Sequence, residues 1–171
     1  MIPDSPDLLF FRRHDRAPSL LGTSEDKVDV FRYRYDVIKQ RLLRNDNFKP
    51  PAFARETDQA EYHKITSIKN LLGCEDQHFL LFGMLSQLQP GRFYLEDLDA
   101  DVELVLDHAE IGSGLFTETC FVLAAGIYLG DNRFQVEELA MPPSEEREQS
   151  LLASKMVNFF GGPVLEDSVS F

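Results

Sequence analysis

Two segments of this sequence carry large apolar side chains on both faces that a β-strand would present. Residues 79–88 have Phe79, Leu81 and Leu85 on one face, and on the other Leu80, Phe82, Met84 and Leu88. Residues 121–129 are apolar throughout apart from one glycine. Because successive side chains of a strand point to opposite faces, a barrel built from such strands buries only one face of each. We therefore expect helices or another domain to cover the second face.

Three further segments have the composition of shorter strands. They cover residues 93–96, 101–107 and 133–139, with turns at "QPGR", "EDLDAD" and "GDN". Five strands with a longer connection between the third and the fourth match the plan of the oligonucleotide/oligosaccharide-binding (OB) barrel. Gly83, inside the first strand, predicts a β-bulge that lets this strand bend. The predicted fold is mainly β, a five-stranded OB-fold barrel with flanking helices.

A helical segment precedes the predicted barrel. Apolar residues recur at i, i+4, i+7 and i+11 of a helix expected over residues 24–44, namely Phe31, Tyr35, Ile38 and Leu42. Ser24 is the expected N-cap, and Pro50 and Pro51 cannot continue the helix. A shorter helix is predicted over residues 66–72. We expect the helix over 24–44 to pack its apolar stripe against the barrel.

Composition and motifs exclude several classes of function. The chain has 171 residues and a formal net charge of −12. Its four histidines and two cysteines lack the spacing of a zinc or metalloprotease site, and no nucleophile elbow is present. We therefore assign no catalytic, cofactor-binding or metal-ligating residue. Cys74 and Cys120 are expected to be reduced thiols. No apolar run is long enough to span a membrane, and the N-terminal residues lack the pattern of a secretory signal. Together with the reduced thiols, this makes the cytosol or the nucleus the expected compartment.

The charge of the predicted barrel bears on whether its ligand is nucleic acid or protein. Residues 79–139 contain eleven acidic side chains and two basic ones, Arg92 and Arg133, for a net charge of −9. Single-strand binding combines a positive groove with stacking aromatic residues. Phe93 and Tyr94 could stack on bases, but the surplus negative charge repels phosphate within a Debye length of about 8 Å. Direct binding of nucleic acid is therefore expected to be weak or absent.

The two doubly apolar strands favour protein as the ligand. Burying one exposed Leu or Phe side chain contributes about 1.5–3 kcal/mol. Several such side chains left exposed would lower solubility. We therefore expect a partner interface that includes Phe82, Met84 and Tyr128, and we expect the chain to self-associate where that interface is left uncovered.

Three strings of residues resemble a known family. They are "RYRYDVIKQRLLRNDNFKP", "YHKITSIKNLLGCEDQHFLLFGMLSQLQPGRFYLEDLDADVELVLDHAEIGSGLFTETCFVLAAGIYL" and "MVNFFGGP". In this order they resemble the second (B) subunit of eukaryotic DNA polymerase epsilon over roughly residues 30–163. The resemblance implies a non-catalytic accessory subunit of a nuclear DNA replication complex, without cofactors. Its implied partners are the zinc-binding C-terminal region of the catalytic subunit and other replisome proteins.

The resemblance also implies a domain layout. Residues 1–23 are expected to form an N-terminal tether, 24–78 a helical segment packing on the barrel, and 79–141 the OB-fold barrel. Residues 142–171 are expected to be an acidic linker and the truncated start of a phosphoesterase-like domain. The sequence is thus expected to be a fragment or a truncated product. Rival interpretations are a stand-alone OB-fold module for single-stranded nucleic acid and a fragment of a hydrolase whose further domain keeps metal ligands.

Overall fold

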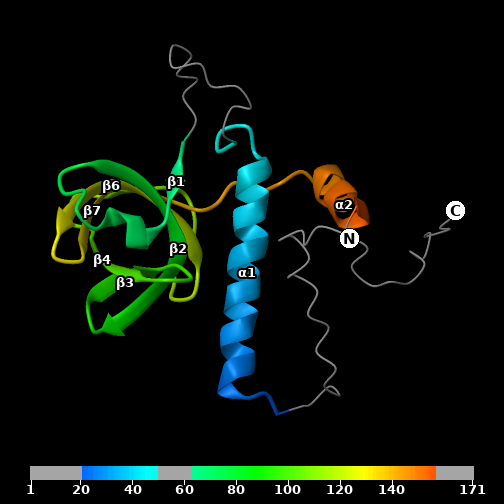
Figure 1. The fold of residues 1–171 in the computed structure, drawn as a ribbon, viewed down its shortest axis with the longest axis horizontal. Coiled ribbons are helices and arrows are strands. Elements are labelled where there is room, and N and C mark those ends of the chain that lie inside the picture. The colour runs from blue at the N-terminus through cyan, green and yellow to red at the C-terminus, as the bar shows by residue number, and fades with distance from the viewer. Residues whose placement is uncertain (1–20, 50–62, 157–171) are drawn as a thin grey trace, which may run out of the picture.

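The computed structural model describes residues 21–49 and 63–156 of the chain. A long helix and a β-barrel stand side by side in it, and a second helix lies on the far side of the first (Figure 1). The helices are α1 (Ser24–Arg44) and α2 (Arg147–Met156). The predicted tether at residues 1–23 falls almost wholly outside the described residues.

Five strands close the barrel, as the sequence predicts. They are β2 (His78–Gln89), β3 (Arg92–Glu96), β4 (Asp101–Val105), β6 (Phe121–Gly130) and β7 (Arg133–Ala140). Around the barrel, β2 pairs with β3, β3 with β4, β4 with β7, β7 with β6, and β6 again with β2. All of these pairs are antiparallel except β4 with β7. A closed ring of this kind leaves no open edge among the five strands.

Short elements extend this ring. β1 (Ile65–Thr66) pairs in parallel with β2, and β5 (Glu110–Ile111) pairs in parallel with β7. The helix predicted over residues 66–72 is wrong in type, because β1 is followed by a short 3-10 helix, Ile68–Leu71. Ile68 and Leu71 are both buried in the barrel core. A 3-10 helix brings residues i and i+3 onto one side, so these two side chains can enter the core together.

The boundaries of α1 agree with those predicted, but its cap differs. Thr23 rather than Ser24 is the N-cap. The backbone N–H of Asp26 donates to Thr23 Oγ1 at 3.3 Å, and the backbone N–H of Thr23 donates to Asp26 Oδ2 at 2.6 Å. This reciprocal pair is a capping box, which satisfies two otherwise unpaired N–H groups at the start of the helix.

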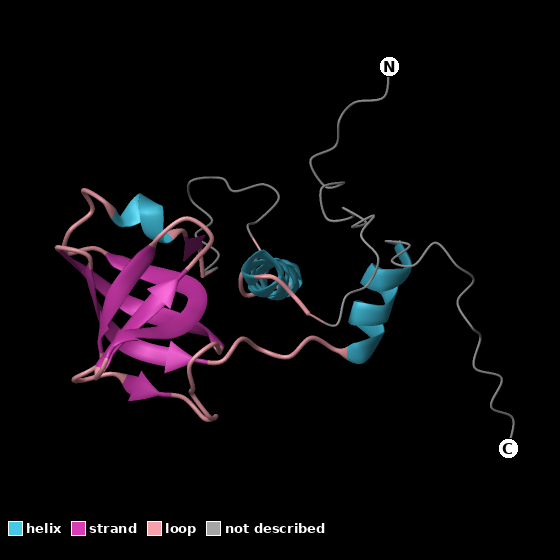
Figure 2. Ribbon diagram, turned by 90° about the horizontal axis from the view of Figure 1, so that it is seen from below, coloured by secondary structure: helices cyan, strands magenta, loops and turns pink. Residues whose placement is uncertain are grey.

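The apolar stripe of α1 faces the barrel, as its periodicity predicts. Tyr35 and Leu42 are buried, and Ile38 is partly buried against the same cluster. The ring of Tyr35 lies 4.9 Å from that of Phe82 on β2 and 6.3 Å from that of Phe121 on β6, measured between centroids. Figure 2 shows α1 end-on, between the barrel and α2. The helix therefore covers the second apolar face of β2 and β6.

The barrel interior takes the other faces of the same strands. Leu81 and Leu85 of β2 and Val122 and Ala124 of β6 are buried there with residues from β3, β4 and β7. Gly83 does not produce the predicted bulge, since the β2–β6 register runs unbroken through it. A Cβ atom at Gly83 would lie 2.6 Å from the carbonyl oxygen of Glu96. The glycine is therefore explained by the close approach of β3.

The segment after the barrel is more ordered than its sequence indicates. Residues predicted as an acidic linker include the start of α2 at Arg147. Cys74 and Cys120 are free thiols, as predicted. Within residues 21–49 and 63–156, neither helix combines the length and the apolar character that a membrane crossing requires.

Replacing Tyr35 by Ala should lower the free energy of unfolding by about 3 kcal/mol, because it empties a buried aromatic site between α1 and the barrel. Tyr33→Ala is the matched control, since Tyr33 lies on the same helix with 46% of its surface exposed. Its effect should stay within about 0.5 kcal/mol. Urea unfolding followed by circular dichroism measures both. Equal losses for the two variants would contradict the packing of α1 on the barrel through Tyr35.

Candidate protein-interaction groove

The structure corrects the predicted partner interface at two of its three residues. Phe82 is 1% exposed and Tyr128 is 4% exposed. Phe82 lies under α1 against Tyr35, and Tyr128 belongs to the core cluster of the barrel. Both side chains already have partners within the chain, so they do not form a surface for another protein in this arrangement. Phe82 is buried because α1 covers the second face of β2, and Tyr128 is buried because it belongs to the cluster inside the barrel.

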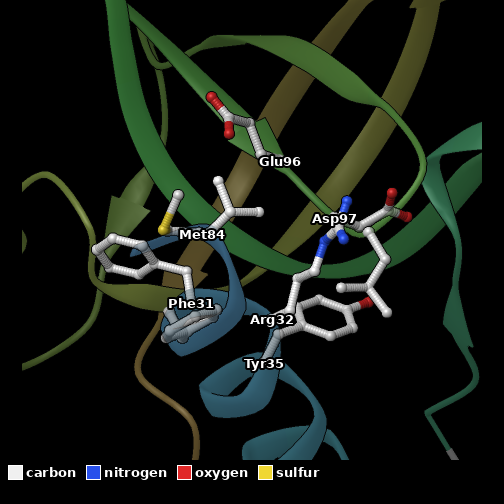
Figure 3. Close-up of a pocket in the computed structure, with 9 residues that line it drawn as sticks. Phe31, Arg32, Tyr35, Met84, Glu96 and Asp97 are labelled. Atoms are coloured by element: carbon white, nitrogen blue, oxygen red, sulfur yellow. The ribbon is translucent and has the colours of Figure 1, made fainter. Parts of the chain in front are cut away.

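Met84 is the predicted residue that remains accessible. Its side chain is partly buried against the helix–barrel cluster. It also lines a cavity of about 250 Å³ between the N-terminal half of α1 and the end of β3. Figure 3 shows Met84 next to Phe31, with Arg32 and Tyr35 of the helix on the other side of the opening. We call this cavity the α1–β3 groove. Its lining residues are Val28, Phe31, Arg32, Tyr35, Met84, Glu96, Asp97, Leu98 and Phe121.

Apolar and aromatic side chains make up most of the α1–β3 groove, and Arg32, Glu96 and Asp97 are its charged lining residues. Phe31, Met84 and Phe121 are half-buried or buried. Val28 is 47% exposed and Leu98 is 43% exposed. Large apolar side chains at the mouth of an apolar cavity are a feature of protein-binding surfaces. The lining contains no serine, cysteine, histidine or lysine.

Asp97 is a structural residue of the groove wall. Its carboxylate accepts hydrogen bonds from Ser67 Oγ at 2.8 Å and from the backbone N–H groups of Ile68, Asp99 and Ala100, each at 2.9 Å. Burial acts to raise the pKa of Asp97, but these hydrogen bonds outweigh it and the net shift is downward. The carboxylate thus joins the β3–β4 turn to the start of the 3-10 helix.

Glu96 differs from its neighbour. Within residues 21–49 and 63–156, no cation lies within ion-pair distance of its carboxylate. Figure 3 shows Glu96 apart from Arg32 and Asp97. Glu96 is partly exposed at the groove. The groove therefore combines an apolar lining with one carboxylate that has no cationic partner.

The aromatic residues of β3 are largely packed into the protein. Phe93 packs against the barrel core, and Tyr94 is 8% exposed. Arg92, one of the two basic residues of the barrel, lies 3.5 Å from Glu103 on β4. Stacking on single-stranded nucleic acid needs accessible aromatic faces. Along β3, Tyr94 has little exposed surface, Phe93 is partly exposed, and Arg92 is paired with Glu103.

A second constellation fixes the segment that leaves the barrel. The carboxylate of Glu145 accepts hydrogen bonds from Arg44 Nε at 2.6 Å and Arg44 Nη2 at 2.8 Å. Ser150 Oγ donates to the same carboxylate at 2.6 Å, and the Glu145 side chain is only 6% exposed. The Arg44 hydrogen bonds lower the pKa of Glu145 to about 2. This clamp ties the C-terminal turn of α1 to the start of α2.

Within residues 21–49 and 63–156, no group of three or more His, Cys, Asp and Glu side chains is arranged to hold a metal ion. A family model described as "DNA polymerase epsilon subunit 2-like, OB-fold domain" matches residues 24–143. The chain belongs to the DNA polymerase epsilon subunit 2 family. The match begins with α1 and ends just after β7, so the helix and the barrel together form the family's OB-fold unit.

Members of this family from distant organisms are similar to the chain. The second (B) subunit of DNA polymerase epsilon from Schizosaccharomyces pombe is 38% identical over 146 residues, which cover 85% of this chain and 25% of that protein. DNA polymerase epsilon subunit 2 of Homo sapiens is 39% identical over 150 residues, which cover 86% and 28%. The corresponding Arabidopsis thaliana protein is 37% identical, with coverage of 91% and 29%. The chain thus spans between a quarter and a third of the length of these relatives.

Two solved structures also resemble the chain. They are described as telomere capping protein Ten1 from Saccharomyces pombe, with a TM-score of 0.41, and the S. pombe Stn1-ten1 complex, with a TM-score of 0.42. Both are 14% identical to this chain. They cover 54% and 57% of it, and 96% and 94% of their own chains. Likeness at this level does not bear on function.

The predicted interface residue Met84 lies in the α1–β3 groove, but sequence reasoning did not indicate the groove's other lining residues. Val28 and Leu98 are far apart in sequence and lie on an N-terminal helical turn and a hairpin turn. Their proximity depends on how α1 crosses the barrel, which no local pattern encodes. The Arg44–Glu145 clamp also joins residues 101 positions apart. The strings of basic residues at the end of α1 and of acidic residues at 145–148 were the available signals.

Lowering the pH should release the clamp at Glu145. The pKa of this carboxyl is about 2 when clamped and 4.5 when free. The stability it contributes is therefore complete above about pH 4.5 and is lost as the pH falls from 4.5 toward 2. Glu145→Gln should remove this stabilisation at neutral pH and lower the free energy of unfolding by about 1 kcal/mol. The loss is modest because Arg44 is partly exposed. Amide hydrogen exchange at Ser150 should then be about fivefold faster.

Glu146→Gln is the control for this prediction, since Glu146 is exposed and takes no part in the clamp. In the Glu146→Gln variant, the amide of Ser150 should exchange at the wild-type rate. Its exchange rate should also depend on pH between 4.5 and 2 as it does in the wild type. If Glu145→Gln exchanges at the wild-type rate and with the wild-type pH dependence, then the clamp does not hold the start of α2.

Proposed function

We propose that this chain is the OB-fold part of a non-catalytic accessory subunit of nuclear DNA polymerase epsilon, and that it acts by binding protein. The expected partners are the C-terminal region of the catalytic subunit and other replisome proteins. The observation that carries the proposal is the family match over the whole helix–barrel unit. In this proposal, residues 24–141 form the protein-binding unit, and residues 142–171 lead toward a phosphoesterase-like domain.

The chemistry of the described surface supports a protein ligand. The barrel segment carries eleven acidic and two basic residues, so it gains no electrostatic attraction to phosphate. Its candidate stacking residues, Phe93 and Tyr94, are packed or buried. The α1–β3 groove is apolar and open, and it holds Met84 from the predicted interface. An apolar groove on an acidic surface suits a polypeptide better than a nucleic acid.

The partner is tested with the full-length subunit and the C-terminal region of the catalytic subunit. Biolayer interferometry should give specific, saturable binding. The full-length subunit with residues 24–143 deleted is the comparison, and it should bind at least tenfold more weakly if the OB-fold unit contributes. Equal affinity with and without residues 24–143 would contradict the proposed role of this unit.

Single-stranded DNA should bind weakly or not at all. Fluorescence anisotropy with a labelled oligonucleotide at about 150 mM salt measures this under conditions where phosphate contacts are partly screened. The stand-alone nucleic-acid module requires submicromolar affinity that falls in Phe93→Ala or Tyr94→Ala. That result would overturn the assignment of protein as the ligand.

A further inference from the structure

The geometry points to the chemistry of the segment that occupies the α1–β3 groove: a polypeptide with a bulky apolar side chain next to a Lys or Arg. The inference rests on the proposed function and names the segment's source as the catalytic subunit. Beyond the proposed function, it specifies where the segment binds, between the N-terminal half of α1 and the end of β3. It also specifies the side chains that this site selects.

The size of the groove favours side chains over a whole small ligand. Its volume is about 250 Å³, below the range of about 300–1,000 Å³ typical of small-molecule sites. One or two large apolar side chains fill such a volume. Phe31, Met84 and Phe121 supply the apolar lining. Met84 adds an unbranched, adaptable side chain, which suits a site that accepts a bulky residue from another chain.

The rim of the groove carries exposed apolar side chains that the backbone of a docked segment would cover. Val28 on α1 and Leu98 on the β3–β4 turn are 47% and 43% exposed. They come from opposite sides of the cavity, because one belongs to the helix and the other to the hairpin. A segment lying between them buries both. The energy of such contacts concentrates in central apolar anchors surrounded by side chains that exclude water.

Charge selects the neighbour of the apolar anchor. Asp97 is already satisfied by Ser67 and three backbone N–H groups, so it has little to offer a partner. Glu96 has no cation within ion-pair distance among the described residues. The hairpin around it adds Asp101 and also Asp99, which Lys69 pairs at 2.6 Å. Arg32 lines the helix side of the groove, so four carboxylates stand against two cations and the local field stays negative. A Lys or Arg beside the apolar anchor is favoured next to Glu96, and an Asp or Glu there is disfavoured.

Two variants of the full-length subunit test the inference against the C-terminal region of the catalytic subunit. Leu98→Asp should raise the Kd about tenfold or more, since it places a charge on the apolar rim. Glu96→Lys should raise the Kd about threefold to tenfold, mainly through a slower association rate, and this effect should shrink at high salt. Thermal unfolding confirms that each variant is folded.

Two controls match these variants in chemistry but lie away from the groove. Leu88→Asp changes a leucine that is 63% exposed at the end of β2. Glu110→Lys reverses an exposed charge on β5. Both should leave the Kd within about twofold. If the wild type binds and all four variants bind equally well, then the groove is not the site, although the proposed function stands. If the wild type does not bind, the proposed function itself fails.

A photo-crosslinking residue in place of Val28 identifies the occupant within the same complex. Mass spectrometry should find the crosslink on a catalytic-subunit segment that has a bulky apolar residue next to Lys or Arg. Changing that cation to Glu should weaken binding to the wild type and restore binding to Glu96→Lys. A crosslink only to the accessory subunit itself or to a second copy, or to a segment without this pattern, would overturn the inference.

Discussion

The fold depends on the burial of two adjacent strands that are apolar on both faces. β2 and β6 pair over seven consecutive residues, and the barrel interior takes only one face of each. The other face is closed by α1, where Tyr35 meets Phe82 and Phe121. Aromatic pairs at such centroid distances contribute beyond the area that they bury. Helix and barrel therefore form one packed unit, in agreement with the family match, which begins at the first residue of α1.

This constraint explains which parts of the structure could be predicted from the sequence. The bounds of α1 and the order of the five barrel strands follow from periodicities of 3.6 and 2, which are local properties. Three local predictions failed for tertiary reasons. The helix over residues 66–72 became β1 and a 3-10 helix, because Ile68 and Leu71 both enter the barrel core. Gly83 serves a close approach of β3, and α2 begins inside the predicted linker.

The candidate site was the least predictable part for the same reason. The sequence showed that β2 and β6 need a cover, and it showed a helix with a suitable stripe. It did not show that the helix would cover Phe82 or that Tyr128 would lie in the barrel core, so both residues were assigned to a partner. Only Met84, near the end of the covered region, remains accessible. To predict an interface from strands that are apolar on both faces, one must know how much of their surface the chain's own elements bury. That buried area is a property of the packed structure.

The position of the α1–β3 groove follows from the shapes of the two packed elements. α1 is a straight helix of 21 residues, whereas the barrel wall curves away from it (Figure 1). Its only fully buried side chains, Tyr35 and Leu42, lie in its C-terminal two-thirds. Toward the N-terminus, Phe31 is half-buried and Val28 is half-exposed. The contact between helix and barrel thus weakens toward the N-terminus of α1, while the clamp between Arg44 and Glu145 lies at the C-terminal end of the helix. The opening therefore forms where α1 meets the acidic β3–β4 turn, so its apolar lining lies beside Glu96.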